Sequence, residues 1–503
     1  MREYKLYTQR MLLIGVTNIL VALSAFILLP LLTKNLSASN YGIWIQFTVT
    51  IGLLTSIVPL GLPWGMVRFL SAENDKNKIK EEFYALITII TFVSVIAALI
   101  SSLFLKPLAG LLFGGNLYIA DLLPIIIILA CLNTLFLNYF RTFKQMKLYS
   151  IFLITQTYLV IILAAYFILI TKQGLSGVVF GYLISFAVSN IIMFLLIVLE
   201  IGVSYPNFQR IREYFSFSLP TVPGNLSYWV INSSDRYVIG ILLGTIFVGY
   251  YSPGYQLGNI ILMLTAPFAL ILPTVLPKYY DNGEMDKVVT FLKYTLKYFL
   301  LLAIPTAFAI SILSQPLLII LTTPKIASSG YLVTPFVALG TILYGINNNF
   351  NQIIVLTKKT KINASIWVFA SFFNLGLNIL LVPYIGIIGA AISTLIAYAV
   401  ALMMTFIYAL KNFEYRIDYK FIIKSTLASI LMSIILVTFK PNVLFNKTVG
   451  LIDIVILSII SAILYLIIMY LLKGITRREI KFFKNLILPS KEISKNKTLY
   501  KKI

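Results

Sequence analysis

The sequence predicts an all-α polytopic membrane protein with about fourteen transmembrane helices, which form two parallel six-helix repeats, or lobes, plus two appended helices. Three observations support this fold class. The chain of 503 residues is 59% apolar and only 11% charged, whereas soluble domains carry about 25% charged residues. Uncharged runs of about 20 residues, the length that one membrane span needs, recur throughout the chain. Two blocks of these runs also resemble each other.

Each predicted span is an apolar run bounded by charged or turn-forming residues. In chain order the spans cover residues 11–33, 41–66, 84–105, 118–140, 149–170, 177–199, 216–243, 247–275, 291–313, 331–354, 363–383, 386–410, 421–439 and 450–472. The first run has full span length and no clear small-residue cleavage site, so we expect a membrane helix and no removable signal peptide. The connections are short, which predicts that no soluble domain is inserted.

The net charge of +23 is distributed unevenly, and this distribution predicts the orientation. With the N-terminus in the cytoplasm, 33 of the 40 Lys and Arg residues fall in cytoplasmic segments. Such asymmetry follows the positive-inside rule, so we expect a plasma-membrane protein with both termini cytoplasmic. The same asymmetry explains the basic composition, and we therefore expect no nucleic-acid partner.

An internal repeat is the most informative feature of the sequence. Segment 174–188 matches segment 386–400 at an offset of 212 residues. Charged positions recur at offsets of 210 to 212: Asp75 and Lys76 with Asp286 and Lys287, Arg68 with Lys278, and Lys147 with Lys359. Because the repeat holds an even number of spans, both copies keep the same orientation. Transporters built from parallel repeats hold their substrate between the halves and expose it alternately to either side.

The repeat also sets the expected boundaries along the chain. We expect an N-terminal six-helix lobe at 1–212, a C-terminal six-helix lobe at 213–412, appended helices 13 and 14 at 413–475, and a basic cytoplasmic tail at 476–503. The two appended helices lie outside the twofold plan.

The sequence excludes several kinds of chemistry. It contains no histidine, and its single cysteine, Cys131, lies in a predicted span, so we expect no metal site and no disulfide. The chain has no Walker A loop, no GxGxxG motif after a strand, no HExxH motif and no pair of acids in an outer loop. We therefore predict no cofactor and no catalytic residue, and a protein that is not an enzyme.

The strongest candidate site lies in the stretch 219–251. This stretch is long enough to cross a bilayer, yet it carries the adjacent pair Asp235 and Arg236. Charge inside a membrane is costly unless it faces a cavity or a partner, which makes the pair a functional-site hypothesis. The Arg236 guanidinium suits bidentate phosphate binding, while Asp235 would orient it or bind a coupling cation. A structural ion pair between two helices is the alternative.

Other candidates surround this pair. Arg68 and Lys278 end the second and eighth spans on the cytoplasmic side, where they would receive an anionic headgroup or act as ordinary positive-inside anchors. The amides of Asn232 and Asn259 suit sugar hydroxyls, although amides in membrane helices also join helices together. The predicted substrate-binding residues are thus Arg236, Asp235, Arg68, Lys278, Asn232 and Asn259.

Three segments resemble the polysaccharide flippases of the multidrug/oligosaccharidyl-lipid/polysaccharide superfamily. They are residues 234–251 (SDRYVIGILLGTIFVGYY), residues 374–393 (NLGLNILLVPYIGIIGAAIS), and residues 40–68, which begin NYGIW and contain GLP. The resemblance covers nearly the whole chain. The last two segments are more specific to the polysaccharide branch than to multidrug exporters or the peptidoglycan-precursor flippase.

The resemblance implies a flippase that moves a polyprenyl-(pyro)phosphate-linked oligosaccharide from the cytoplasmic to the outer leaflet by alternating access. It also implies fourteen helices with the last two appended, and a cation-lined cavity between the lobes. Carried over to this chain, it makes Arg236 the first headgroup contact and Arg68 the next. The chain departs from the family in having few embedded cations, with Lys34 as the other candidate near the cleft.

Two other functions stay open at this point. One is a multidrug or small-molecule cation antiporter of the same fold, and the other is a membrane glycosyltransferase. The partners we expect are a lipid-linked oligosaccharide and membrane lipids, with H⁺ or Na⁺ as candidate coupling ions. We expect the protein to be a monomer.

Overall fold

The computed structural model describes residues 2–413, 418–439, 450–475 and 479, and no strand occurs in them. The first part of the chain forms α1 (Arg2–Asn35), α2 (Ala38–Ile57), α3 (Leu62–Leu70), α4 (Lys76–Leu103), α5 (Leu105–Leu112), α6 (Leu117–Thr142), α7 (Met146–Ala165), η1 (Tyr166–Ile170), α8 (Gly174–Ile201) and α9 (Ile211–Ser218). The second part forms η2 (Leu219–Thr221), α10 (Val222–Leu242), α11 (Thr245–Gly258), η3 (Asn259–Thr265), α12 (Ala266–Asp281), α13 (Met285–Leu321), α14 (Pro324–Gly330), α15 (Val333–Leu356), α16 (Thr360–Asn412), α17 (Tyr419–Phe439) and α19 (Leu451–Leu471). The predicted tail, 476–503, lies outside the described residues except for Glu479.

The predicted all-α polytopic membrane fold is confirmed. Among the described residues, nine helices are long and apolar enough to cross a membrane, or up to twelve if each of three bent pairs is one span. The number of fourteen spans stays a prediction. Within α16 the helix breaks at Gly386, with φ 62°, between two predicted spans. A Cβ on Gly389 would lie 2.8 Å from the Leu381 carbonyl oxygen, a contact that a straight helix cannot make, so the chain turns sharply there.

The second predicted span is bent rather than continuous. Leu60 and Gly61 adopt positive φ angles of 55° and 70°, and α2 and α3 on either side of them meet at an angle of 48°. A left-handed residue cannot continue an α-helix. The bend directs α3 across the end of the bundle, against α9.

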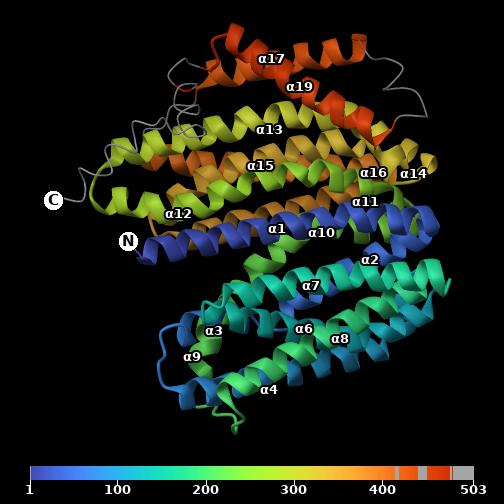
Figure 1. The fold of residues 1–503 in the computed structure, drawn as a ribbon, viewed down its shortest axis with the longest axis vertical. Helices are drawn as coiled ribbons and strands as arrows, with labels where there is room; N and C mark the ends of the chain where they lie inside the picture. Colours follow the sequence, from blue (N-terminus) through green and yellow to red (C-terminus); the bar gives the residue numbers. More distant parts are fainter. Residues whose placement is uncertain (1, 414–417, 440–449, 476–478, 480–503) are drawn as a thin grey trace.

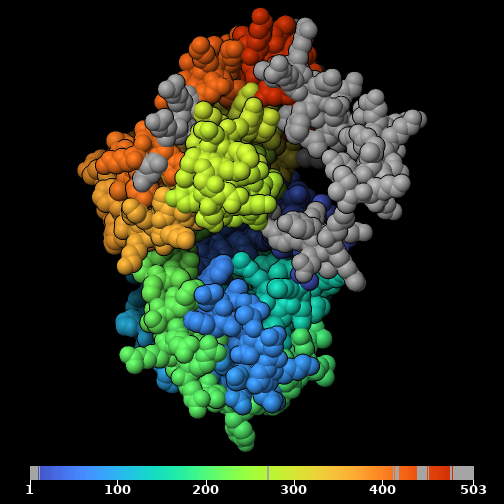
Figure 2. Space-filling model, turned by 90° about the vertical axis from the view of Figure 1, so that its left-hand side faces the viewer, coloured from blue at the N-terminus to red at the C-terminus, as the bar shows by residue number. Residues whose placement is uncertain are grey.

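The helices form two bundles with α1 between them (Figure 1). α3, α4, α6, α7 and α8 gather in one bundle, whereas α12, α13, α15 and α16 belong to the other. α17 and α19 pack on each other and on α13, at the side of the second bundle that is remote from the first. Figure 2 shows the two bundles one above the other, with the dark-blue residues of α1 visible along the seam.

The two ends of the bundles differ in charge and in packing. We call the end where α3, α6 and α12 finish the basic end, because lysines such as Lys76, Lys144 and Lys287 follow these helices. The opposite end, where α1 and α10 finish and α2 and α11 begin, is the far end. At this end α2, which packs on α6 of the first bundle, meets α10 and α11, which pack on α16 and α15 of the second, so this end joins the two bundles.

At the far end α2 and α11 touch backbone to backbone. A Cβ on Gly42 would lie 1.8 Å from the Thr245 carbonyl oxygen, and one on Gly249 would lie 2.0 Å from the Ala38 carbonyl oxygen. The hydroxyls of Ser39 and Thr245 are 2.8 Å apart at the same place. Only glycine permits so close an approach. We call this contact between α2 and α11 the far-end seal.

The connection from α8 to α9 is fixed to α4. Arg210 Nη1 pairs with Glu82 Oε1 at 2.9 Å, and the Tyr214 hydroxyl donates to Glu82 Oε2 at 2.6 Å. Asn207 Nδ2 donates to Glu81 Oε2 at 3.0 Å. Burial and the hydrogen bond to Glu82 raise the pKa of Tyr214, so its hydroxyl stays protonated and remains a donor. The segment that connects α8 to α9 is therefore attached to α4 through Asn207, Arg210 and Tyr214.

Candidate functional site

The helix α10 carries the predicted charge pair. Pro220 and Pro223 each occupy the second position of their helix, η2 and α10, within the first turn, where a missing N–H removes no helical hydrogen bond. From there α10 runs to Leu242 and buries Asp235 and Arg236 with 0% and 7% of their surfaces exposed. Two charged side chains at such burial need partners inside the protein.

Asp235 and Arg236 satisfy each other and engage two tyrosines. Arg236 Nη1 lies 2.7 Å from Asp235 Oδ1, which also accepts the Arg236 backbone N–H at 2.9 Å. The Tyr251 hydroxyl donates to Asp235 Oδ2, and Arg236 Nη1 donates to the Asn232 carbonyl oxygen. The guanidinium carbon lies 3.8 Å from the ring centre of Tyr255, within cation–π range. The opposite charges therefore compensate each other within the protein.

The first bundle closes this site through α2. Gln46 Nε2 donates to the Arg236 carbonyl oxygen at 2.7 Å, and the Tyr237 hydroxyl donates to Thr50 Oγ1 at 2.7 Å. Gly240 admits Gln46, since a Cβ there would lie 1.9 Å from Gln46 Nε2. The charge pair thus lies directly behind a contact between α2 and α10, where two bundles meet.

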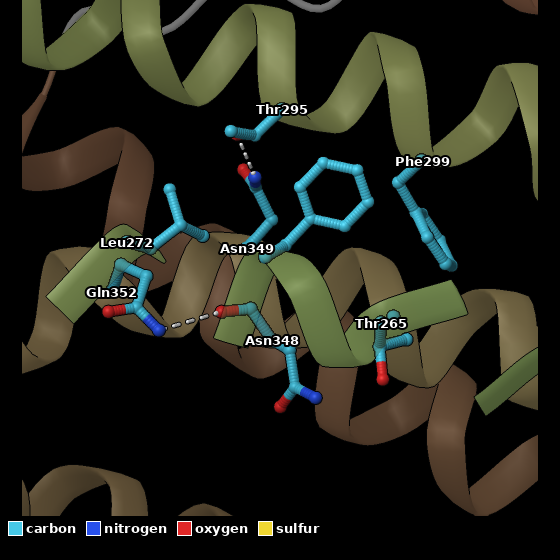
Figure 3. Close-up of a pocket in the computed structure, with 9 residues that line it drawn as sticks. Thr265, Leu272, Thr295, Phe299, Asn348, Asn349 and Gln352 are labelled. Atoms are coloured by element: carbon cyan, nitrogen blue, oxygen red, sulfur yellow. Dashed lines mark hydrogen bonds between the residues drawn. The ribbon is translucent and has the colours of Figure 1, made fainter. Parts of the chain in front are cut away.

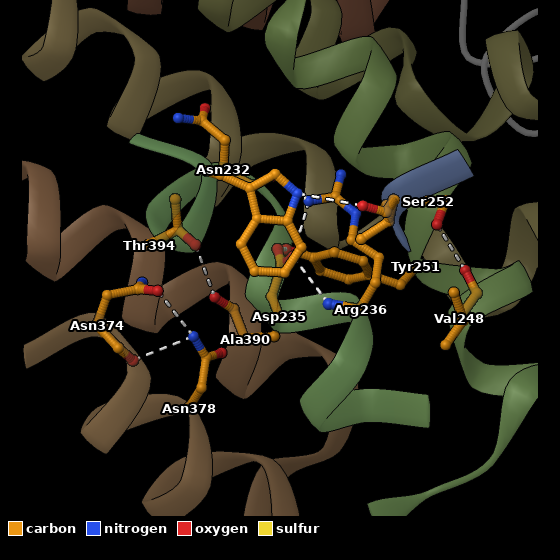
Figure 4. A network of polar contacts seen from close by, with 12 residues as sticks. Asn232, Asp235, Arg236, Val248, Tyr251, Ser252, Asn374, Asn378, Ala390 and Thr394 are labelled. Carbon is orange, nitrogen blue, oxygen red and sulfur yellow. Dashed lines mark hydrogen bonds and ion pairs between the residues drawn. The ribbon is translucent and has the colours of Figure 1, made fainter. Parts of the chain in front are cut away.

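On its other side α10 packs against α16, which contributes a second set of polar groups (Figure 4). The Tyr398 hydroxyl donates to Asn232 Oδ1 at 2.9 Å. Asn378 Nδ2 donates to Asn374 Oδ1 at 3.1 Å, and Thr394 Oγ1 donates to the carbonyl oxygen of Ala390, 3.2 Å away. Asn374 Nδ2 and Asn378 Oδ1 are buried without a partner. The Asn374 donor and the Asn378 acceptor could therefore each form a hydrogen bond with a ligand or ion that enters the contact between α10 and α16.

The structure brings three of the six predicted site residues together and leaves the others elsewhere. Asn232, Asp235 and Arg236 share one network on α10. Asn259 lies in η3, where its Oδ1 accepts from Thr341 at 3.4 Å. Arg68 and Lys278 are exposed near the last turns of α3 and α12, at the basic end. No cluster of three metal-binding His, Cys, Asp or Glu side chains occurs in the described part of the chain.

Among the cavities that lie outside the charge pair, two adjoin helices that carry predicted site residues. One, of about 130 Å³ between η3, α12, α13 and α15, is lined by amides and hydroxyls, with Asn349 Nδ2 bonded to Thr295 Oγ1 at 2.8 Å (Figure 3). The other, of about 520 Å³, lies between α3 and the start of α10 and contains Arg68. The larger cavity places one of the predicted cations in an open space at the basic end.

Comparison with known proteins identifies the family. The profile of a family described as "Polysaccharide biosynthesis protein" matches residues 8–276, which is more than half of the chain. The chain belongs to this family. A second profile, MatE, matches residues 220–380. The family match confirms the resemblance found in segments 40–68 and 234–251.

One curated protein and several solved structures are similar to this chain. "Probable low-salt glycan biosynthesis flippase Agl15" of Haloferax volcanii is 23% identical over 246 residues, which are 49% of this chain and 52% of the relative. The match thus spans about half the length of that relative. The structure "Lipid II flippase MurJ, inward closed conformation" is similar with a TM-score of 0.74 at 19% identity, covering 95% of this chain and all of that one. An inward-facing multidrug resistance MATE family transporter of the MOP superfamily gives 0.64 at 14% identity, with 79% of this chain and 97% of that chain covered. Both structures establish the shared fold.

Three side chains of this site are not among the six residues that the sequence predicts. They are Gln46, Tyr398 and Thr394, which come from α2 and α16. Each is a polar residue within an apolar run, and this position is the feature by which the sequence could have indicated a role in the site. Their partners are more than 150 residues away in two of the three cases, at separations of 190 and 166, so local patterns could not single them out.

Proposed function

We propose that this protein flips a polyprenyl-(pyro)phosphate-linked oligosaccharide from the cytoplasmic to the outer leaflet by alternating access, for the synthesis of cell-surface polysaccharide or glycan. The observation that carries the proposal is the asymmetry of the contact between the bundles. They meet backbone to backbone at the far-end seal, whereas a cavity of about 520 Å³ separates α3 from α10 at the basic end. Alternating access requires a molecule that closes at one side at a time. Family membership and the name of the Haloferax relative support this cargo.

Arg236 is the residue that we assign to the phosphate. With the seal closed, Asp235 and the Asn232 carbonyl engage its Nη1. When α2 separates from α10, the hydrogen bond from Gln46 to the Arg236 carbonyl is lost and one wall of the site is removed. The guanidinium then becomes accessible, while Asp235 keeps it oriented. Hydrogen bonds between charged groups contribute about 1.5–3 kcal/mol each.

The other predicted residues have supporting roles in this proposal. Arg68 and Lys278, both exposed at the basic end, receive the anionic headgroup on the cytoplasmic side. The amides of Asn232 and Asn259 contact sugar hydroxyls. The membrane orientation follows from the same assignment: the basic end faces the cytoplasm, both termini are cytoplasmic, and the protein resides in the plasma membrane.

The two moving parts are the lobes 1–212 and 213–412, with 413–475 as appended helices. The packing of α17 and α19 on α13 supports this division. The predicted equivalent residues Gly174 and Gly386 have nearly the same backbone conformation, with φ values of 59° and 62°. This likeness supports the proposed repeat, because positive φ angles are uncommon in helical segments.

A coupling ion, H⁺ or Na⁺, fits best at the contact between α10 and α16. The buried Oδ1 of Asn378 has no partner there, and Asp235 lies on the facing helix. An ion that binds Asp235 competes with Arg236 for the carboxylate. Ion binding at Asp235 would therefore weaken the pair, whereas phosphate binding at Arg236 leaves Asp235 in place to orient the guanidinium. We further propose that the protein acts as a monomeric transporter and catalyses no bond cleavage.

Flipping in reconstituted vesicles tests the proposal. Purified protein is placed in liposomes that contain a fluorescent lipid-linked oligosaccharide, and movement is followed by bleaching the outer leaflet. We expect flipping by the wild type, its loss in Arg236→Ala, partial retention in Arg236→Lys, and no change in the α10 control Ser233→Ala. Undiminished flipping by Arg236→Ala at equal protein levels would refute the assigned role.

A multidrug or small-molecule cation antiporter is the second candidate, because the MatE profile matches residues 220–380. Drug-resistance profiles of cells with and without the gene separate the two functions: an exporter alters resistance, whereas the flippase alters surface glycan. A membrane glycosyltransferase is the less favoured alternative, and sugar transfer from a lipid donor by the purified protein would support it.

A further inference from the structure

A further cavity at the basic end lies between α1 and the turn that joins α6 to α7. Three basic residues line it: Arg10 comes from α1, whereas Lys144 and Lys147 come from the turn and from the beginning of α7. Its volume of about 380 Å³ is within the range of about 300–1,000 Å³ typical of small-molecule sites. The cavity therefore has room for a ligand of the size of a lipid headgroup.

The basic side chains of this cavity have no acidic partner in the described part of the chain. All three are exposed, and none of the ion pairs found there involves Arg10, Lys144 or Lys147. Glu200 reaches the lining through its Oε1, which accepts from Gln145 Nε2 at 2.6 Å, so this carboxylate is engaged by an amide. Three like charges around one space repel one another, and an anion placed between them removes this repulsion.

The remaining lining of the cavity is largely apolar. Leu13 on α1 and Met146 and Leu148 on α7 contribute to it. A ligand in this cavity would therefore contact both apolar and cationic side chains. An inorganic anion would gain only from the cations, whereas a phospholipid would also bury hydrocarbon against the apolar side chains.

The position of the cavity along the helices matches the headgroup layer of a membrane. Arg10 lies just before the candidate span Leu12–Asn35, and Lys144 stands between the candidate spans Leu117–Thr142 and Met146–Ile170. The cations thus lie where apolar spans begin and end, which is the level of the lipid phosphates. Basic residues at this level attract anionic lipids.

The corresponding turn in the second half of the chain offers a comparison. In the turn between α15 and α16, Lys358 has the same left-handed backbone as Lys144, with φ values of 58° and 59°. At the proposed repeat offset of 212 residues, however, Val222 stands where the first half has Arg10. The second half therefore keeps a basic turn but has no cation at the start of the facing helix, α10.

We propose that the cavity between α1 and α7 binds the headgroup of an anionic phospholipid of the surrounding bilayer, with Arg10, Lys144 and Lys147 around its phosphate. This lipid is a component of the membrane and not the cargo, so the inference goes beyond the proposed flippase function. α1 lies between the two bundles (Figure 1) and packs on α7 of the first and on α13 of the second. A headgroup that joins Arg10 to the two lysines holds the start of α1 against the first bundle.

Native mass spectrometry of the purified full-length protein in detergent tests this lipid site. The probes are dioctanoyl phosphatidylglycerol, dioctanoyl phosphatidylcholine and inorganic phosphate. We expect phosphatidylglycerol to bind most tightly, because phosphatidylcholine carries a positive charge beside its phosphate and inorganic phosphate has no acyl chains. Each basic residue near a membrane surface contributes a factor of about 5 in lipid affinity. Arg10→Gln should thus weaken phosphatidylglycerol binding about 5-fold, and the triple variant Arg10→Gln/Lys144→Gln/Lys147→Gln about 100-fold.

The matched control removes three charges from the corresponding turn of the second half. It is the triple variant Lys358→Gln/Lys359→Gln/Lys361→Gln, whose lysines are exposed and do not line the cavity, and it should bind phosphatidylglycerol like the wild type. Arg10→Lys keeps the charge and should retain most of the binding. Size-exclusion profiles equal to that of the wild type show that each variant is folded.

The lipid site is overturned if the triple variant at Arg10, Lys144 and Lys147 binds phosphatidylglycerol like the wild type. An equal loss of binding in the control variant also overturns it, since the basic end would then attract anionic lipid only in general. Binding of phosphatidylcholine or inorganic phosphate as tight as that of phosphatidylglycerol would contradict the assigned ligand. Displacement of phosphatidylglycerol by an equal concentration of a short-chain polyprenyl diphosphate would assign the cavity to the cargo instead. None of these measurements depends on flipping, so the site and the proposed function stand or fall separately.

Discussion

Replacing Gly42 by alanine should open the far-end seal. The added Cβ would stand 1.8 Å from the Thr245 carbonyl oxygen and 3.1 Å from the Gly249 nitrogen. Carbon–oxygen contacts are normally no shorter than about 3.3 Å, so α2 and α11 must separate by about 1.5 Å. Both clashing groups are backbone, and no side-chain rotation relieves them. Overpacking of this kind costs about 1–3 kcal/mol, which lowers the population with a closed seal about 5- to 150-fold relative to the open one.

Cysteine labelling measures this change directly. The single native cysteine, Cys131, is buried and is first replaced by serine. A cysteine introduced at Thr50, which is 5% exposed and bonded to Tyr237 across the contact, reports on opening. With a membrane-impermeant maleimide added outside intact cells, its labelling rate should rise in Gly42→Ala by up to the factor given above, while flipping slows.

The matched control is Gly376→Ala on α16, because a Cβ there meets nothing within 4 Å. It should change neither labelling nor flipping. If Gly42→Ala labels and flips like the wild type, the contact between α2 and α11 does not open during transport, and the proposal that the far-end seal closes one side of the protein is refuted.

Three further substitutions test other parts of the structure. Asp235→Asn leaves Arg236 buried without a carboxylate and should cost about 3–5 kcal/mol of stability. The double variant Asp235→Asn/Arg236→Met should recover part of this loss. A melting temperature of Asp235→Asn equal to that of the wild type, or no recovery in the double variant, would contradict this. Gln46→Ala removes the hydrogen bond to the Arg236 carbonyl and should destabilise the closed contact between α2 and α10 by about 1–3 kcal/mol. Faster outward labelling would show this, and unchanged labelling argues against it. Gly386→Ala places a Cβ at φ 62° and should cost about 1–2 kcal/mol, with a lower melting temperature as the readout and an unaltered one as the contrary result.

The sequence predicts the fold well because membrane spans follow from local composition. The break at Gly386 appears where the predicted spans 363–383 and 386–410 meet, since the apolar run exceeds the length of a single span. The bend at Gly61 was missed, although GLP follows Pro59 in the chain, because a run of apolar residues hides a local change in backbone angles. Periodicity and length describe the spans but not their bends.

The candidate site was predictable only in part, for a related reason. Charge within an apolar run singles out Asp235 and Arg236, and both are indeed buried. The sequence could not show that Gln46 supports Arg236 from 190 residues away, because such a contact depends on how two bundles meet. Arg68 was predicted from its position at the end of a span, whereas the cavity around it depends on the packing of α9 against α3.

In the proposed transport cycle, the attachment of the α8–α9 connection to α4 determines where the molecule would pivot. Because Glu82 on α4 binds both Arg210 and Tyr214, we expect this connection to move with the N-terminal bundle and not to absorb the rotation. The torsion must then fall on the few dihedral angles of η2, where Pro220 already restricts one of them. The flipping cycle would accordingly be a rotation about one short hinge. A covalent cross-link between the α8–α9 connection and α4 would then leave the flipping rate unaltered.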